Sequence, residues 1–132
     1  MPKTIVNPPW LPKPSGFSHG IEASGRLLFL AGQTAQDAEG RIVAPGDLVG
    51  QFQQALANVG AVVGARGGTL KDLVKLTFYV RDKNDYRDKT KAIGKIYREM
   101  MEGHYPATTL VEVAALWDDA ALIEIDGIAV LG

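Results

Sequence analysis

The stretch that decides the fold is His104–Leu131, HYPATTLVEVAALWDDAALIEIDGIAVL. Within it, Thr108–Ala114 and Leu122–Leu131 each have the alternation of a β-strand, and a short polar connection joins them. In the second strand Glu124 and Asp126 lie two residues apart in an otherwise apolar row. A carboxylate in such a row costs free energy unless it finds hydrogen bonds, a charge partner or water. The pair is therefore the first indication of a functional site.

The N-terminal half predicts a hairpin and two flanking strands. Phe17–Ala23 alternates, Arg26–Thr34 follows as a return strand, and Ser24-Gly25 has the composition of a two-residue hairpin turn. Short strands are also expected at Lys3–Val6 and Arg41–Val43. These segments are predicted to join the strands of the C-terminal stretch.

The middle of the chain predicts a helix, a strand and a second helix. Asp47 is a good N-cap for a helix that glycines stop at Gly64 and beyond, and Leu73–Arg81 alternates as a strand. Asn84 or Asp85 is then expected to cap a helix with an apolar stripe of Tyr86, Ile93, Ile96 or Tyr97, and Met100, and Gly103 ends it. The order of elements is that of an α+β domain, with a mixed β-sheet and two helices packed on one face.

Apolar residues are expected on both faces of this sheet. Leu27–Leu30 is apolar throughout, and Val111, Ile128 and Val130 add further apolar rows. Two helices can cover only one face, and an uncovered apolar face would form a large patch in contact with water. The sequence therefore predicts that another subunit covers the second face.

Length and composition exclude several classes of protein. The 132 residues predict one domain, residues 1–132, and the formal net charge of −1 gives no general attraction to nucleic acid or anionic membranes. The chain has no cysteine, which excludes disulfides, thiolate catalysis and cysteine-based zinc sites. No apolar run approaches the ~20 residues that span a bilayer, and the N-terminus lacks the apolar core of a signal peptide. A cytoplasmic protein is the default expectation.

Two motifs of the C-terminal stretch resemble the closing signature of a known family. Tyr105–Val113, YPATTLVEV, and Ile123–Val130, IEIDGIAV, are similar to that of the RidA (YjgF) family, whose members are small trimeric enzymes that hydrolyse reactive imines and enamines. The resemblance continues through Ala31–Gln33 and Gln54–Asn58. It implies a chorismate-mutase-like fold, a homotrimer with a central barrel, pockets between subunits, and no cofactor.

Glu124 is the catalytic residue that the resemblance implies. In the family the matching acid positions the water that attacks the C=N carbon, and such a carboxylate can act as general base and then as general acid. The spacing of Glu124 alone favours another role, in which the carboxylate satisfies backbone groups or shields a sheet edge. The resemblance reverses that preference.

The main departure from the family is Thr108, which stands where the active deaminases carry an arginine. That arginine holds the substrate carboxylate through two charge-assisted hydrogen bonds, whereas a threonine hydroxyl offers one neutral donor. Phe17 replaces a tyrosine, Ala31 a serine and Thr90 an asparagine. The substrate-binding positions that the resemblance assigns are Phe17, Ala31, Gly32, Thr90, Thr108 and Leu110. The pocket is expected to be drier and less cationic than in the active deaminases.

The two histidines, His19 and His104, flank segments that are expected to line this pocket. Either is a candidate to supply a proton or positive charge in place of the arginine, although a loop histidine with a local hydrogen bond is the commoner case. Neither has the paired spacing of a metal ligand, so no metal site is predicted.

Three functions are consistent with these residues. The first is hydrolysis of a small imine or enamine with altered specificity, and the second is a non-catalytic trimer that binds a small metabolite. The third is association with RNA through a basic stripe on the second helix, Arg87, Lys91, Lys95 and Arg98. Acidic residues interrupt that stripe and no aromatic residue interleaves with it for base stacking, so a solvated helix face is favoured and nucleic acid is not an expected partner.

Overall fold

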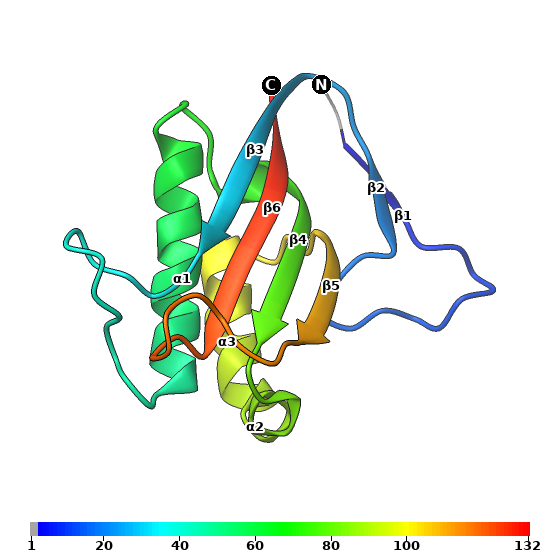
Figure 1. Cartoon of the computed structure of the whole chain (residues 1–132). Coiled ribbons are helices and arrows are strands. Elements are labelled where there is room, and N and C mark those ends of the chain that lie inside the picture. The colour runs from blue at the N-terminus through cyan, green and yellow to red at the C-terminus, as the bar shows by residue number, and fades with distance from the viewer. Residues whose placement is uncertain (1–2) are drawn as a thin grey trace.

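The computed structural model describes residues 3–132 and has a central sheet with helices on one side (Figure 1). The elements in chain order are β1 (Thr4–Val6), β2 (Gly20–Glu22), β3 (Arg26–Gln33), α1 (Leu48–Gly64), a 3-10 turn (Leu70–Asp72), β4 (Leu73–Val80), α2 (Lys83–Asp88), α3 (Thr90–Met101), β5 (Ala107–Glu112) and β6 (Ile123–Leu131). The architecture is the predicted α+β class with a mixed sheet.

The strand order of the main sheet is β3-β6-β4-β5. β6 runs antiparallel to both β3 and β4, and β5 runs parallel to β4, with α2 and α3 in the crossover between them. The two strands of the C-terminal stretch are therefore not neighbours, because β4 lies between them. β6 occupies a central position, with paired strands on both sides, and its alternating residues serve both faces of the sheet.

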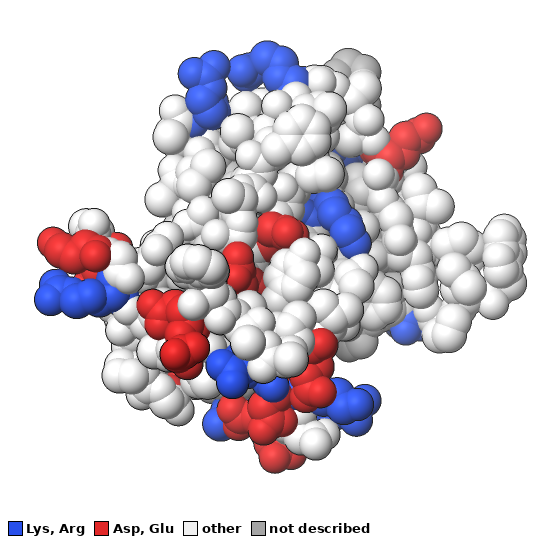
Figure 2. Space-filling model, viewed as in Figure 1, with Lys and Arg blue, Asp and Glu red and all other residues white. Residues whose placement is uncertain are grey.

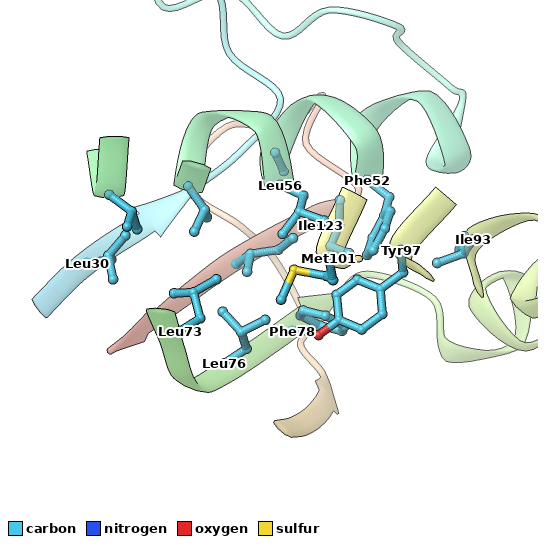
Figure 3. Close-up of a cluster of buried hydrophobic side chains, with 14 of the residues drawn as sticks. Leu30, Phe52, Leu56, Leu73, Leu76, Phe78, Ile93, Tyr97, Met101 and Ile123 are labelled. Carbon is cyan, nitrogen blue, oxygen red and sulfur yellow. The ribbon is translucent and has the colours of Figure 1, made fainter. Parts of the chain in front are cut away.

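The core lies between the sheet and the two longer helices, α1 and α3, which lie behind the sheet in Figure 1. Asp47 caps α1 as predicted, because its side chain accepts a hydrogen bond from the backbone N–H of Gly50. Figure 3 shows Phe52 and Tyr97 from the helices meeting Phe78 from β4, and each pair of these rings makes an edge contact with centroids 5.7–5.8 Å apart.

The predicted hairpin through Ser24-Gly25 is wrong. β2 pairs with β1 in a separate two-stranded sheet, whereas β3 pairs with β6. Gly25 has a φ of 146°, and a Cβ there would lie 2.7 Å from the carbonyl oxygen of Leu131. Ser24-Gly25 is therefore a connection between the two sheets, and β3 pairs with the central strand β6. The expected strand Arg41–Val43 is reduced to a single bridge between Gln36 and Ile42.

The predicted second helix is divided into α2 and α3. Asp82, not Asn84 or Asp85, is the N-cap of α2, and its side chain accepts hydrogen bonds from the backbone N–H groups of both those residues. The helical path is interrupted at Lys89, and α3 ends at Glu102 in a left-handed conformation with φ of 54°. Only Arg81 separates Asp82 from the end of β4, so Asp82 lies where the chain leaves the strand and the helix begins.

The face of the sheet opposite the helices is open, and Figure 2 shows acidic side chains there with a basic side chain close to them, surrounded by white surface. On β3, Leu27 is 58% and Phe29 69% exposed, which confirms that this strand is apolar on both faces. Val111 is exposed as well, while Val130 is buried. In the described part of the chain, no helix combines the length and apolar character needed to cross a membrane.

Candidate functional site

A cavity of about 540 Å³ lies on the helix side of the sheet, at the edge formed by β5. It is bounded by β5, by α2 and α3, and by the loop that precedes β2. Four of the predicted substrate-binding residues line it: Phe17, Thr90, Thr108 and Leu110. These residues come from three segments far apart in the sequence, so the fold brings them together.

Sequence reasoning missed part of this cavity. The further lining residues are Ser15, Gly16, Phe78, Tyr86, Lys91, Ile93, Gly94, Tyr97 and Tyr105. Tyr86, Ile93 and Tyr97 belong to the apolar stripe predicted for the second helix. Their apolar spacing was the only indication that they face the interior, and it did not separate the core from the cavity. Lys91 was assigned only to a solvated basic stripe.

The two threonines of the cavity do not offer free hydrogen-bond donors. Thr108 Oγ1 donates to the carbonyl oxygen of Pro106 at 2.8 Å, and Thr90 Oγ1 donates to that of Arg87 at 2.8 Å. Each hydroxyl has a single proton, and both protons are used by the local backbone. Thr108 thus replaces the expected arginine with a group that presents only acceptor capacity to the cavity.

Tyr97 contributes a buried hydroxyl group beside Thr108. Within residues 3–132 this hydroxyl has no hydrogen-bond partner. Burial raises the pKa of Tyr97, an effect that the nearby Thr108 hydroxyl opposes, and burial raises the pKa of Tyr86 to about 12. Both phenols therefore stay neutral donors at ordinary pH.

Glu124 lies on the opposite, open face of the sheet. Its carboxylate rests over the backbone of Gly32, where any Cβ would overlap it. Gly32 sits at an irregularity of β3 between Leu30 and Gln33, next to the exposed Ala31. This close approach is a physical reason for glycine at position 32.

The two carboxylates of β6 have different surroundings. Asp126 accepts a hydrogen bond from the Tyr79 hydroxyl at 3.0 Å, which raises the pKa of Tyr79. The Glu124 carboxylate, although half-buried, has no hydrogen-bond or ion-pair partner among the residues that the structure describes. Glu124 is therefore the member of the pair that is free to act on a water molecule or ligand.

The predicted site residues thus form two groups on opposite faces of one sheet. Phe17, Thr90, Thr108 and Leu110 line the cavity, while Glu124, Gly32 and Ala31 lie on the open face. Side chains on opposite faces of a sheet cannot contact the same small molecule within one chain. A single copy of the chain consequently keeps the predicted site residues in two separate groups.

The histidines do not line the cavity. His19 Nε2 donates to the carbonyl oxygen of Pro12 at 2.8 Å, and His104 Nε2 donates to that of Leu73 at 2.6 Å. The bond of His19 is the local one of the commoner alternative, whereas that of His104 reaches a residue 31 positions away in the sequence. Among residues 3–132, no cluster of three or more His, Asp or Glu side chains is arranged to hold a metal ion.

Comparison with known proteins places the chain among close relatives. The family model described as Endoribonuclease L-PSP matches residues 11–131. A RutC family protein of Pyrococcus horikoshii is 39% identical over 119 residues, which cover 89% of this chain and 90% of that protein. The 2-iminobutanoate/2-iminopropanoate deaminase of Dermatophagoides farinae is 32% identical over 131 residues, which cover 98% of each chain.

A solved structure extends this similarity to the whole fold. The crystal structure of a protein of unknown function from Yersinia pestis, described as a member of the conserved Rid protein family, superposes with a TM-score of 0.88 at 39% identity. The match covers 99% of this chain and 100% of that one. The chain therefore belongs to the Endoribonuclease L-PSP family, the RidA (YjgF) family that its C-terminal motifs resemble.

Proposed function

We propose that the protein hydrolyses a small reactive imine or enamine in a pocket between two subunits of a homotrimer, with Glu124 as general base. The observation that supports this most is the division of the site into two half-sites on opposite faces of the sheet. A second copy docked on the open face would cover Leu27 and Phe29 and bring its own cavity to Glu124.

The chemistry follows from the free carboxylate. Glu124 takes a proton from water as the water oxygen attacks the C=N carbon, and it passes that proton to the nitrogen. Glu124 then moves the hydroxyl proton to the nitrogen as the C–N bond breaks and the C=O bond forms, so imine and water become a carbonyl compound and ammonia or an amine. An enamine enters the same route after its carbon is protonated.

Altered specificity is the finer part of the proposal. The Dermatophagoides farinae relative is named for 2-iminobutanoate and 2-iminopropanoate, and both names describe carboxylates. In the present chain Thr108 gives a carboxylate no cation and no free hydroxyl proton. We therefore expect 2-iminopropanoate to be hydrolysed poorly or not at all.

A non-catalytic trimer that binds a metabolite is the second candidate. It is favoured by the loss of donors at Thr90 and Thr108, since these leave fewer groups to order a reacting water. RNA association has less support, because Figure 2 shows Lys and Arg intermixed with Asp and Glu around α2, and Lys89 pairs with Asp85.

Exchange of Glu124 for glutamine tests the proposal. Glu124→Gln keeps the shape but removes the base, so imine hydrolysis should fall by about 10²–10⁴-fold while the assembly stays intact. Glu22→Gln, the same exchange on an exposed residue of β2, is the matched control. The imines are generated in place by an amine or amino-acid oxidase, and their loss is followed through a trapping adduct. Unchanged turnover by the glutamine variant would remove Glu124 from the mechanism.

A further inference from the structure

We infer that the cavity beside Thr108 accepts an uncharged ligand with an aromatic ring where the carboxylate-binding relatives take a carboxylate. The statement that this ligand is an imine or enamine rests on the proposed function. The statement about its ring and charge rests on the cavity alone.

Five of the thirteen residues that line the cavity are aromatic. The rings that line it are Phe17, Phe78, Tyr86, Tyr97 and Tyr105, from four parts of the chain. The Tyr97 ring lies 5.9 Å from that of Tyr105 in a tilted arrangement and 5.8 Å from that of Phe78 edge to face. The volume of about 540 Å³ lies within the usual range for small-molecule sites. Such walls favour a flat ring, which can stack or make edge contacts.

The charges around the cavity disfavour an anion. The hydroxyl protons of Thr90 and Thr108 are bound to backbone carbonyls, so neither solvates a carboxylate. Lys91 is the one cationic residue among the lining residues given above, and it is exposed, so water screens its charge. In the proposed assembly the open face of a second copy would add the negative charge of Glu124, and it would also bring Lys75, whose Nζ donates a hydrogen bond to Thr109 Oγ1 on that face.

The hydroxyl group of Tyr97 favours a ligand that carries a hydrogen-bond acceptor. This neutral hydroxyl is buried at the wall beside Thr108 and makes no hydrogen bond in the described part of the chain. Such a donor is satisfied when a ligand brings an acceptor to it. An imine nitrogen or a carbonyl oxygen next to the ring supplies that acceptor without adding charge.

Three carbonyl compounds can measure separately how the aromatic ring and the negative charge of a ligand affect its binding. Pyruvate carries only the carboxylate, phenylacetone only the ring, and phenylpyruvate both, and in each the carbonyl oxygen stands for the imine nitrogen. Calorimetric titration of the wild-type protein should show phenylacetone binding at least about tenfold more tightly than pyruvate. Phenylpyruvate should bind no more tightly than phenylacetone.

Two glycines provide a matched pair of variants. Gly94 on α3 lines the cavity, Gly64 ends α1 away from it, and a Cβ at either position meets no atom within 4 Å. Gly94→Leu should weaken phenylacetone binding about tenfold or more because its side chain enters the cavity, whereas Gly64→Leu should not change it. Leucine is the better helix former, so both variants should stay folded, which thermal unfolding verifies.

Three results would overturn the inference. One is pyruvate binding as tightly as phenylacetone with loss of that binding in Lys91→Met, which would make Lys91 the carboxylate anchor. The second is unchanged phenylacetone binding in Gly94→Leu, and the third is no binding of phenylacetone to the wild type. Glu124→Gln should retain phenylacetone binding, so failure of hydrolysis and failure of this inference are observed separately.

Discussion

The two faces of the main sheet differ in how far one chain completes them. On the helix side, Leu76 and Ile125 are fully buried and Phe78 is 4% exposed. On the open side, which also carries the unpartnered Glu124, Leu27 and Phe29 stay largely exposed. One chain therefore builds a complete core on the helix side and leaves a second apolar layer exposed on the open side.

The two groups of predicted site residues are divided in the same way between the helix side and the open side of the sheet. The cavity with Thr108 belongs to the finished face, and its hydroxyl groups are bound to the chain's own backbone. Glu124 belongs to the unfinished face, where its carboxylate is left without a partner. In the proposed assembly the same contact that covers the apolar layer also completes the site.

The largest effect on stability is expected in the core on the helix side of the sheet. Phe52 is fully buried between the helices and the sheet, so Phe52→Ala should lower the free energy of unfolding by about 3–5 kcal/mol. Trp117→Ala is the control, because that side chain is fully exposed, and its change should stay within about 0.5 kcal/mol. Urea unfolding at one fixed protein concentration measures both. Equal losses would show that the core is not where the structure places it.

The next effect concerns the unfinished face. The wild-type protein should be a trimer by light scattering on a size-exclusion column, and Phe29→Asp should dissociate it. Removing a buried aromatic anchor from an interface costs about 2 kcal/mol or more, and the new carboxylate adds a desolvation cost. Trp117→Asp should leave the trimer intact. A trimeric Phe29→Asp variant would mean that this face is not the interface.

A smaller effect is expected at the cavity. Thr108→Arg should raise hydrolysis of 2-iminopropanoate about ten- to hundredfold, because a hydrogen bond to a charged group contributes about 1.5–3 kcal/mol. Recovery should be incomplete, since Phe17 and Ala31 lack hydroxyls that order substrate and water. Thr4→Arg, on an exposed strand away from the cavity, is the control. Robust wild-type activity, or no gain from the arginine in a folded trimer, would contradict this account of specificity.

Much of the fold was predictable because its signals are local. The alternation of Ile123–Leu131 and the cap at Asp47 each depend on neighbouring residues, and both were predicted correctly. The hairpin at Ser24-Gly25 failed because strand pairing is a long-range choice, made by burial beside β6. The break at Lys89 was missed because an uninterrupted apolar stripe gives no sign of it.

The candidate site was predictable only in part. The resemblance selected Phe17, Thr90, Thr108 and Leu110, and the fold gathers them in one cavity. The role of Tyr97 was hidden, because sequence periodicity cannot distinguish an apolar side chain that faces a core from one that faces a cavity. The residue type of Thr108 indicated a donor, but only the structure reveals that Pro106 uses it.

The central claim is that two copies of the chain each supply half of one site, and mixing two impaired variants tests it most directly. Gly94→Leu impairs the cavity half and Glu124→Gln the carboxylate half, so each alone should keep at most about a tenth of the wild-type activity on the imine that the wild type hydrolyses fastest. Equal amounts, unfolded together and refolded, should recover about one quarter of wild-type activity, because in random trimers about one interface in four pairs two intact halves. Activity that stays at the level of the separate variants would contradict the claim and place the whole site within one chain.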